Sequence, residues 1–224
     1  MSGRDLRTAR RALGQSQVAA ARRWHVSQAY LSLMERGQRP VPERLARLVV
    51  RTEPRLATGL TLVAPRQTSS NLEQLLGSLG YPGFEYLGHP RTVENPAAVV
   101  LAALRASAVP ARVTEALPWV LLAYPHLDWD WLLDQVRLLN RQNRLGFLVT
   151  MAKQLAERRG DQATRAVLER VEQRLEDARL VKEDTLGRSL TEVERGHLRA
   201  SRPVAATHWN VLTTLQVDHL RYAV

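Results

Sequence analysis

Between residues 13 and 39, apolar positions recur at helical spacing in two short runs. The runs, at residues 17–23 and 28–36, each follow a serine (Ser16 and Ser27), and serine is a favoured N-cap. Three residues separate the first run from the second serine, so the connection is a tight turn. The apolar positions suit two helices that cross steeply around one small core: Val18, Ala21, Trp24, Val26, Leu31 and Met34. The pattern therefore predicts a helix-turn-helix.

This segment resembles the Cro/C1-type (XRE) helix-turn-helix family of phage repressors and bacterial regulators over about residues 4–50. These residues carry the resemblance: Arg10, Ser16, Gln17, Ala21, Val26, Ser27, Leu31, Ser32, Glu35, Arg36, Gly37, Pro42, Leu45 and Leu48. The resemblance implies a lambda-repressor-like bundle in which Arg10 pairs with Glu35 and ties the first helix to the recognition helix. Two positions depart from the family. His25 stands where glycine is usual, at a positive φ that histidine tolerates. Ala20 stands where a larger aliphatic residue is usual, and we expect Trp24 to fill the missing volume.

The resemblance places the second helix in a DNA major groove, with its N-terminal end at the base edges. Leu31 and Met34 must point inward, so the base-contacting residues are expected on the opposite face: Gln28, Ala29, Ser32 and Leu33. In the family the residue matching Gln28 commonly contacts a base edge, and glutamine can bond bidentately to adenine. The expected phosphate contacts are Gln17, Ser27, Tyr30, Arg36, Gln38 and Arg39.

The rest of the chain predicts an all-α protein, in which the small bundle is joined to a larger helical C-terminal domain. We expect a DNA-binding domain at residues 1–63, a linker with one short helix at 64–95, and a helical dimerisation or partner-binding domain at 96–224. The expected helices are Pro42–Val50, a short one after Pro54, Pro96–Ser107, Pro110–Ala123, Asp128–Arg141, Asn143–Arg159, a heptad-spaced stretch at 161–182, Thr191–Arg199, and an amphipathic segment at Val204–Tyr222.

Two C-terminal stretches leave alternatives open. The heptad-spaced stripe within 161–182 is expected to pack on its own domain or on a second subunit. Residues 140–147 are unusually polar for a position between two apolar helices. A helix junction capped by asparagines explains them better than a ligand or protein-contact site does.

Positive charge is concentrated on the predicted DNA-binding domain at residues 1–63, which is called the reader below. The net charge is +10. Residues 1–51 hold eleven arginines and three carboxylates, a balance of +8, which leaves about +2 for the remainder. There is no cysteine, and the longest apolar run, at 97–104, is too short to span a bilayer. These features predict a soluble cytoplasmic protein with double-stranded DNA as its partner.

Catalytic and metal sites are not expected. The six histidines show no metal-ligand spacing, and no phosphate-binding loop or serine elbow is present. Asp128 and Asp130 point apart at a helix start, where they favour the helix dipole instead of acid–base work. We therefore expect no enzyme activity, no metal and no cofactor.

Two functions fit the sequence. The first is a sequence-specific DNA-binding transcriptional regulator, a repressor that binds a palindromic operator as a homodimer. The second is a bacterial antitoxin that binds its toxin through the C-terminal domain and represses its own operon. A small-molecule sensor is a third possibility, but the sequence shows no convergent set of polar residues for it.

Overall fold

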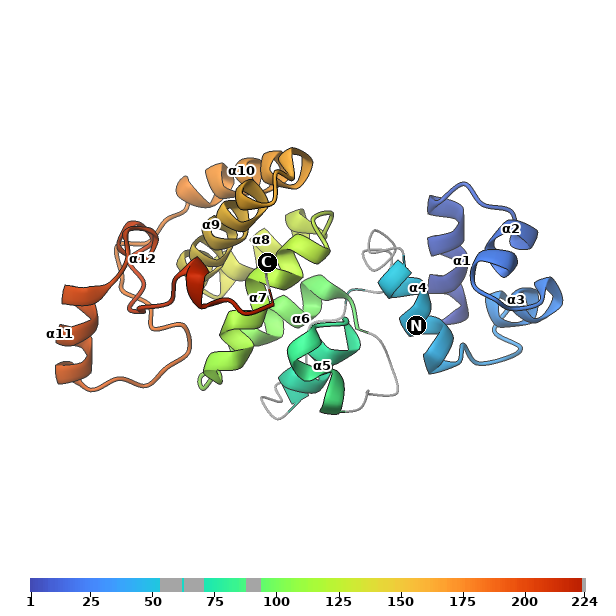
Figure 1. Cartoon of the computed structure of the whole chain (residues 1–224), viewed down its shortest axis with the longest axis horizontal. Helices are drawn as coiled ribbons and strands as arrows, with labels where there is room; N and C mark the ends of the chain where they lie inside the picture. Colours follow the sequence, from blue (N-terminus) through green and yellow to red (C-terminus); the bar gives the residue numbers. More distant parts are fainter. Residues whose placement is uncertain (53–61, 63–70, 88–93, 223–224) are drawn as a thin grey trace.

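The computed structural model describes residues 1–52, 62, 71–87 and 94–222. Every regular element in these ranges is helical, so the protein is all-α (Figure 1). The N-terminal bundle contains α1 (Gly3–Ala12), α2 (Gln17–Arg23), α3 (Gln28–Glu35) and α4 (Glu43–Thr52). The short helix expected after Pro54 lies outside the described residues.

The remaining helices form the larger C-terminal part of the chain. They are α5 (Leu72–Ser78), the 3₁₀ helix η3 (Pro82–Leu87), α6 (Pro96–Arg105), α7 (Ala111–Ala123), α8 (Trp129–Leu138), α9 (Gln142–Arg158), α10 (Gln162–Glu176), α11 (Glu192–Ser201), α12 (Val204–His208) and the 3₁₀ helix η4 (Val217–His219). Polar side chains cap four of these helices at their N-termini: Asn95, Asp128, Asp161 and Thr191. None of the described helices has the length and apolar character needed to cross a bilayer.

Buried apolar side chains gather in two clusters. The smaller cluster is made by α1–α4, and the larger one is made by α5–α10 and α12 with η3 and η4, together with Ala46 of α4. Within the larger cluster α9 is central, because α7, α8, α10 and α12 all pack against it. Residues 71–87, which the sequence placed in the linker, contribute buried side chains such as Leu76 and Phe84 to this cluster.

The heptad-spaced stripe of α10 packs within the same chain. Leu168, Val171 and Leu175 are buried, and α10 lies along α9 over most of its length (Figure 1). The stripe is therefore already covered, and it is not an exposed surface on which a second subunit could pack.

The prediction of one amphipathic segment from Val204 to Tyr222 is wrong about its conformation. After α12 the backbone at Asn210 takes a φ of 50°, and η4 is the next helical turn. The reason is a long-range contact. The Trp209 indole lies on Gly146 and donates a hydrogen bond from Nε1 to Thr150 Oγ1 at 2.7 Å, which fixes the end of α12 against α9.

Candidate nucleic-acid interface

Two serine caps and a tight turn set the geometry of α2 and α3. The Ser16 hydroxyl accepts a hydrogen bond from the Ala19 N–H, and the Ser27 hydroxyl accepts one from the Tyr30 N–H, each at 3.2 Å. Between the two helices His25 has a φ of 53°, a left-handed conformation that histidine adopts more readily than most non-glycine residues. The tight turn thus carries the chain from the end of α2 to the capped start of α3.

The core beneath α3 is small and apolar. Its buried members are Leu6, Ala9, Ala20, Ala21, Trp24, Leu31, Met34, Leu45 and Val49. The expectation that Val18 belongs to this core is wrong, because its side chain is 51% exposed. The largest side chain of this core is that of Trp24, which is 1% exposed. Since the indole fills the space, α2 presents Ala20 and Ala21 to the core, and Val18 faces solvent.

An ion pair joins α1 to α3. Arg10 donates from Nε to Glu35 Oε1 at 2.6 Å and from Nη2 to Glu35 Oε2 at 3.0 Å, so the pair is bidentate. The Glu35 side chain is 1% exposed. Arg10 also donates from Nη1 to the Gln15 carbonyl at 2.8 Å, which attaches the α1–α2 loop to the same guanidinium. The pair therefore fixes the C-terminal end of α3 against α1.

Opposing effects act on the pKa of Glu35. Burial raises it, but the hydrogen bonds from Arg10 and Gln17 and the charges of Arg10 and Arg7 lower it, and the net result is a pKa below the ordinary value. The hydrogen bond to Glu35 likewise raises the pKa of Arg10 above its ordinary value against the effect of burial. Both groups are therefore ionised at neutral pH.

The ion pair continues into the candidate DNA-contacting residues. Gln17 donates from Nε2 to Glu35 Oε2 at 2.9 Å, and its Oε1 accepts a hydrogen bond from Gln28 Nε2 at 2.9 Å. One chain of hydrogen bonds thus joins four side chains from three helices: Arg10, Glu35, Gln17 and Gln28. The sequence indicated Gln17 and Gln28 separately but did not reveal this link. Both glutamines open a helix directly after a serine cap, which is the signal that could have suggested it.

The four residues expected to contact bases lie on the outward face of α3. Gln28 and Ala29 are exposed, and Ser32 and Leu33 are half-buried, while Leu31 beside them is fully buried. The N-terminal turn of α3 is therefore open to solvent in the intact chain. A helix end of this kind fits the major groove of B-DNA.

The residues expected to contact phosphate surround this face. Gln38 and Arg39 are exposed, and their backbone N–H groups bond to the Leu33 carbonyl at 2.9 and 3.3 Å. Arg36 is exposed and donates from Nε to the Ser32 carbonyl at 3.3 Å. Of the others, Ser27 is exposed, whereas Gln17 and Tyr30 are half-buried, and Tyr30 packs partly against the small core.

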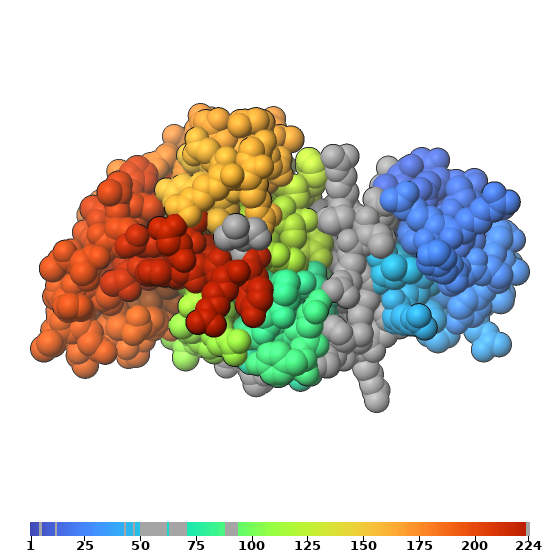
Figure 2. Space-filling view, in the orientation of Figure 1, coloured from blue at the N-terminus to red at the C-terminus, as the bar shows by residue number. Residues whose placement is uncertain are grey.

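The surface of the N-terminal bundle is rich in arginine. The exposed arginines among its described side chains are Arg4, Arg7, Arg11, Arg22, Arg23, Arg36, Arg39 and Arg44. The carboxylate of Glu35 is buried in its ion pair and does not offset them at the surface. Figure 2 shows this end of the molecule, carrying α1–α4, uncovered by the C-terminal helices in the view drawn.

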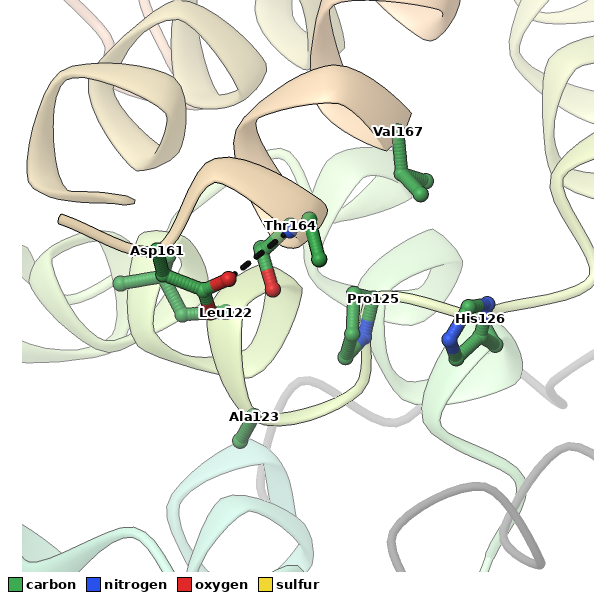
Figure 3. Close-up of a pocket in the computed structure, with 8 residues that line it drawn as sticks. Leu122, Ala123, Pro125, His126, Asp161, Thr164 and Val167 are labelled. Atoms are coloured by element: carbon green, nitrogen blue, oxygen red, sulfur yellow. Dashed lines mark hydrogen bonds between the residues drawn. The ribbon is translucent and has the colours of Figure 1, made fainter. Parts of the chain in front are cut away.

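Two hollows are lined by residues outside α3. One, of about 500 Å³, lies between the end of α7 and the start of α10 (Figure 3). Its lining is mostly apolar, and the Asp161 carboxylate accepts a hydrogen bond from Thr164 as the cap of α10. The other, of about 650 Å³, adjoins Trp24 and α4. Among the described residues no three histidine, aspartate or glutamate side chains group as a metal site.

Comparison with known proteins agrees with this geometry. The family described as helix-turn-helix domain matches residues 3–53, the segment that contains α1–α4. The search of curated proteins and the search of solved structures gave no match. Residues 3–53 are therefore a helix-turn-helix domain consistent with the Cro/C1 type, and such a domain indicates a DNA-binding regulator.

Proposed function

We propose that the protein is a sequence-specific transcriptional regulator, a repressor that binds a palindromic operator as a homodimer. The supporting observation is the N-terminal turn of α3, where Gln28 and Ala29 are exposed and Gln28 is held by Gln17. Gln28, Ala29, Ser32 and Leu33 would contact base edges. The six polar and basic residues around them would contact the phosphates: Gln17, Ser27, Tyr30, Arg36, Gln38 and Arg39.

The proposal of a dimer rests on the short stretch of DNA that one recognition helix can contact. One recognition helix contacts only a few base pairs, so useful specificity needs two copies on neighbouring half-sites. We propose that residues 1–63 bind DNA and that 96–224 pair the two copies, as expected from the sequence. The expected linker, 64–95, does more than connect, because its α5 and η3 pack in the C-terminal core. Because the α10 stripe is buried against α9, the pairing surface lies elsewhere in that part.

Selection of bound sequences from a random DNA pool tests this function. We expect a consensus with two-fold symmetry, which would support reader and dimer together. Binding to the selected duplex should weaken steeply as salt is raised, because neutralised phosphates release counterions. Recovery of no enriched sequence, or binding that is indifferent to salt, would overturn the proposal.

A second candidate function, the antitoxin, is favoured by apolar side chains left exposed far from the reader. Val181 is 96% exposed, Val193 84% and Val204 88%, and the segment that holds them lies at the opposite end of the molecule from α3 (Figure 1). A protein partner would cover such side chains. Relief of a neighbouring gene product's toxicity on co-expression, lost in Val193→Glu, would support this function.

A further inference from the structure

A small polar cavity of about 210 Å³ lies where three parts of the C-terminal region meet. The parts are the α8–α9 junction at residues 140–144, the segment 180–185, and α11. From the sequence alone a capped helix junction explains residues 140–147 better than a ligand site does, because the residues that complete the cavity are far away along the chain. The structure brings them together, and this cavity is separate from the helix-turn-helix.

The cavity has a rigid floor. Arg144, whose side chain is 7% exposed, donates from Nε to Asp184 Oδ1 at 2.5 Å and from Nη1 to the Leu104 carbonyl at 2.9 Å. Asn143 bonds the backbone of Leu180 twice, with Nδ2 donating to the carbonyl and Oδ1 accepting from the N–H, each at 2.8 Å. The segment 180–185 is thus fixed to the start of α9, and the cavity is formed before any ligand arrives.

The carboxylates that line the cavity are already neutralised. Asp184 is paired with Arg144. Glu183 accepts two hydrogen bonds from Arg199, at 2.8 and 2.7 Å, and this interaction holds its pKa below the ordinary value. Each carboxylate therefore already has one arginine as its close partner, and the other cations of the lining act on it at longer range: Arg141 lies 3.9 Å from Asp184, and the charge of Arg195 acts on Glu183.

The remaining cations of the lining are poorly compensated. In the described part of the chain no carboxylate lies within 4.0 Å of the Lys182 ammonium. Arg195 meets Glu192 at 3.6 Å, but the Glu192 side chain is 83% exposed, so this contact is weak. Arg141 lies 3.9 Å from Asp184, and its buried Nε has no hydrogen-bond partner. A buried guanidinium N–H without an acceptor is unfavourable. The Arg141 side chain as a whole is 33% exposed, so the rest of its guanidinium is open to an anion.

We propose that this cavity binds the phosphate group of a small phosphorylated molecule. Arg141, Lys182 and Arg195 approach from three separate parts of the fold, which suits the diverging oxygens of a tetrahedral group better than a planar carboxylate. Guanidinium groups pair well with phosphate, and the ammonium adds a compact charge. The bound group would also connect α11, of which Leu198 is the buried residue, to the start of α9. The site does not depend on the proposed DNA-binding function.

Calorimetric titration of the full chain with inorganic phosphate and with glycerol phosphate tests the proposal. We expect saturable binding of both, a raised melting temperature, and weaker binding of acetate. Arg141→Gln and Lys182→Gln should each reduce affinity by about tenfold, the effect of one charge-assisted hydrogen bond. The basic reader could also attract phosphate, so Arg36→Gln is the matched control: it should leave phosphate binding unchanged and weaken DNA binding.

Lys182 is exposed, and among the described residues no hydrogen bond or ion pair involves its side chain, so Lys182→Gln should fold normally even if Arg141→Gln does not. The proposal is overturned if the wild-type chain shows no saturable phosphate binding or if acetate binds as tightly. It is equally overturned if Arg36→Gln abolishes binding while Lys182→Gln retains it, because the anion would then sit on the reader.

Discussion

Gln28 Nε2 lies 2.9 Å from Gln17 Oε1 and donates a hydrogen bond to it. The residue proposed to read a base is therefore held by one proposed to contact a phosphate, and Gln17 is in turn held by Glu35. A side chain restrained in this way loses less conformational freedom on binding than a free one. The protein presents this part of the reader already ordered.

Replacing Gln28 tests base recognition. Gln28→Ala should weaken binding to the selected operator by about tenfold or more, since a good bidentate contact contributes about 1–3 kcal/mol of discrimination. Binding to unrelated DNA should change little, and preference should flatten at one base pair of each half-site. Electrophoretic shifts on both duplexes measure this, with Gln162→Ala, at an exposed position in the first turn of α10, as the control. Equal weakening on both duplexes would show that Gln28 does not read bases.

Replacing Arg39 tests the phosphate contacts. Arg39→Gln should weaken binding to operator and unrelated DNA alike, because a phosphate contact carries no sequence information. The slope of log affinity against log salt should fall by about one per half-site. The measurement is a series of titrations at several salt concentrations. An unchanged slope would place Arg39 away from the backbone.

The Arg10–Glu35 pair predicts a non-additive mutant cycle. Arg10→Met alone leaves a buried carboxylate without its partner and should lower the free energy of unfolding by about 3 kcal/mol. Arg10→Met combined with Glu35→Met should cost less than that single change. Urea denaturation measures all the variants. The exposed Arg158–Asp218 pair supplies the control, and Arg158→Met should change stability by about 0.5 kcal/mol or less.

The lowered pKa of Glu35 predicts acid sensitivity. Below the ordinary glutamate pKa of about 4.3 the unfolded chain binds a proton that the folded chain does not yet bind. The contribution of Glu35 to stability is therefore fully present above that pH and is lost as pH falls through the lower folded-state pKa. Denaturation midpoints from pH 7 to pH 3 should show this loss. In Glu35→Gln the same series should fall less steeply, and an identical fall would contradict the assignment.

Gly146 predicts a steric test of the α9–α12 contact. A Cβ at this position would lie 2.4 Å from the Trp209 ring, so Gly146→Ala should destabilise the fold by about 1–3 kcal/mol. Gly196 in α11 is the matched control, because a Cβ there meets nothing within 4 Å. Gly196→Ala should be neutral or stabilising by about 0.5–1 kcal/mol, since alanine favours helix over glycine. Thermal melts distinguish the two, and tolerance of Gly146→Ala would mean that the indole is not fixed against α9.

Local signals in the sequence predicted much of the N-terminal bundle. The serines at residues 16 and 27 act through hydrogen bonds within three residues, and the bounds of α2 are as expected. Val18 was misplaced because helical spacing alone does not say which of two adjacent stripes is buried. The bulk of Trp24 decided that question, and its position depends on tertiary packing.

Long-range contacts explain what the sequence did not show. The segment after α12 has apolar spacing that fits a helix, but the indole of Trp209 packs on Gly146, 63 positions earlier, and the backbone turns at Asn210. The cavity beside Arg141 likewise depends on residues about 40 positions further along the chain. Neither arrangement has a periodic or capping signature.

The position of α11 at the far end of the molecule from α3 has a consequence for the operator (Figure 1). Two copies joined through α11 would hold their recognition helices at the two distal ends of the particle. They would then favour half-sites many base pairs apart, or a looped duplex, instead of adjacent half-sites about 34 Å apart. The number of base pairs between the two halves of a selected sequence would therefore indicate which surface joins the two subunits.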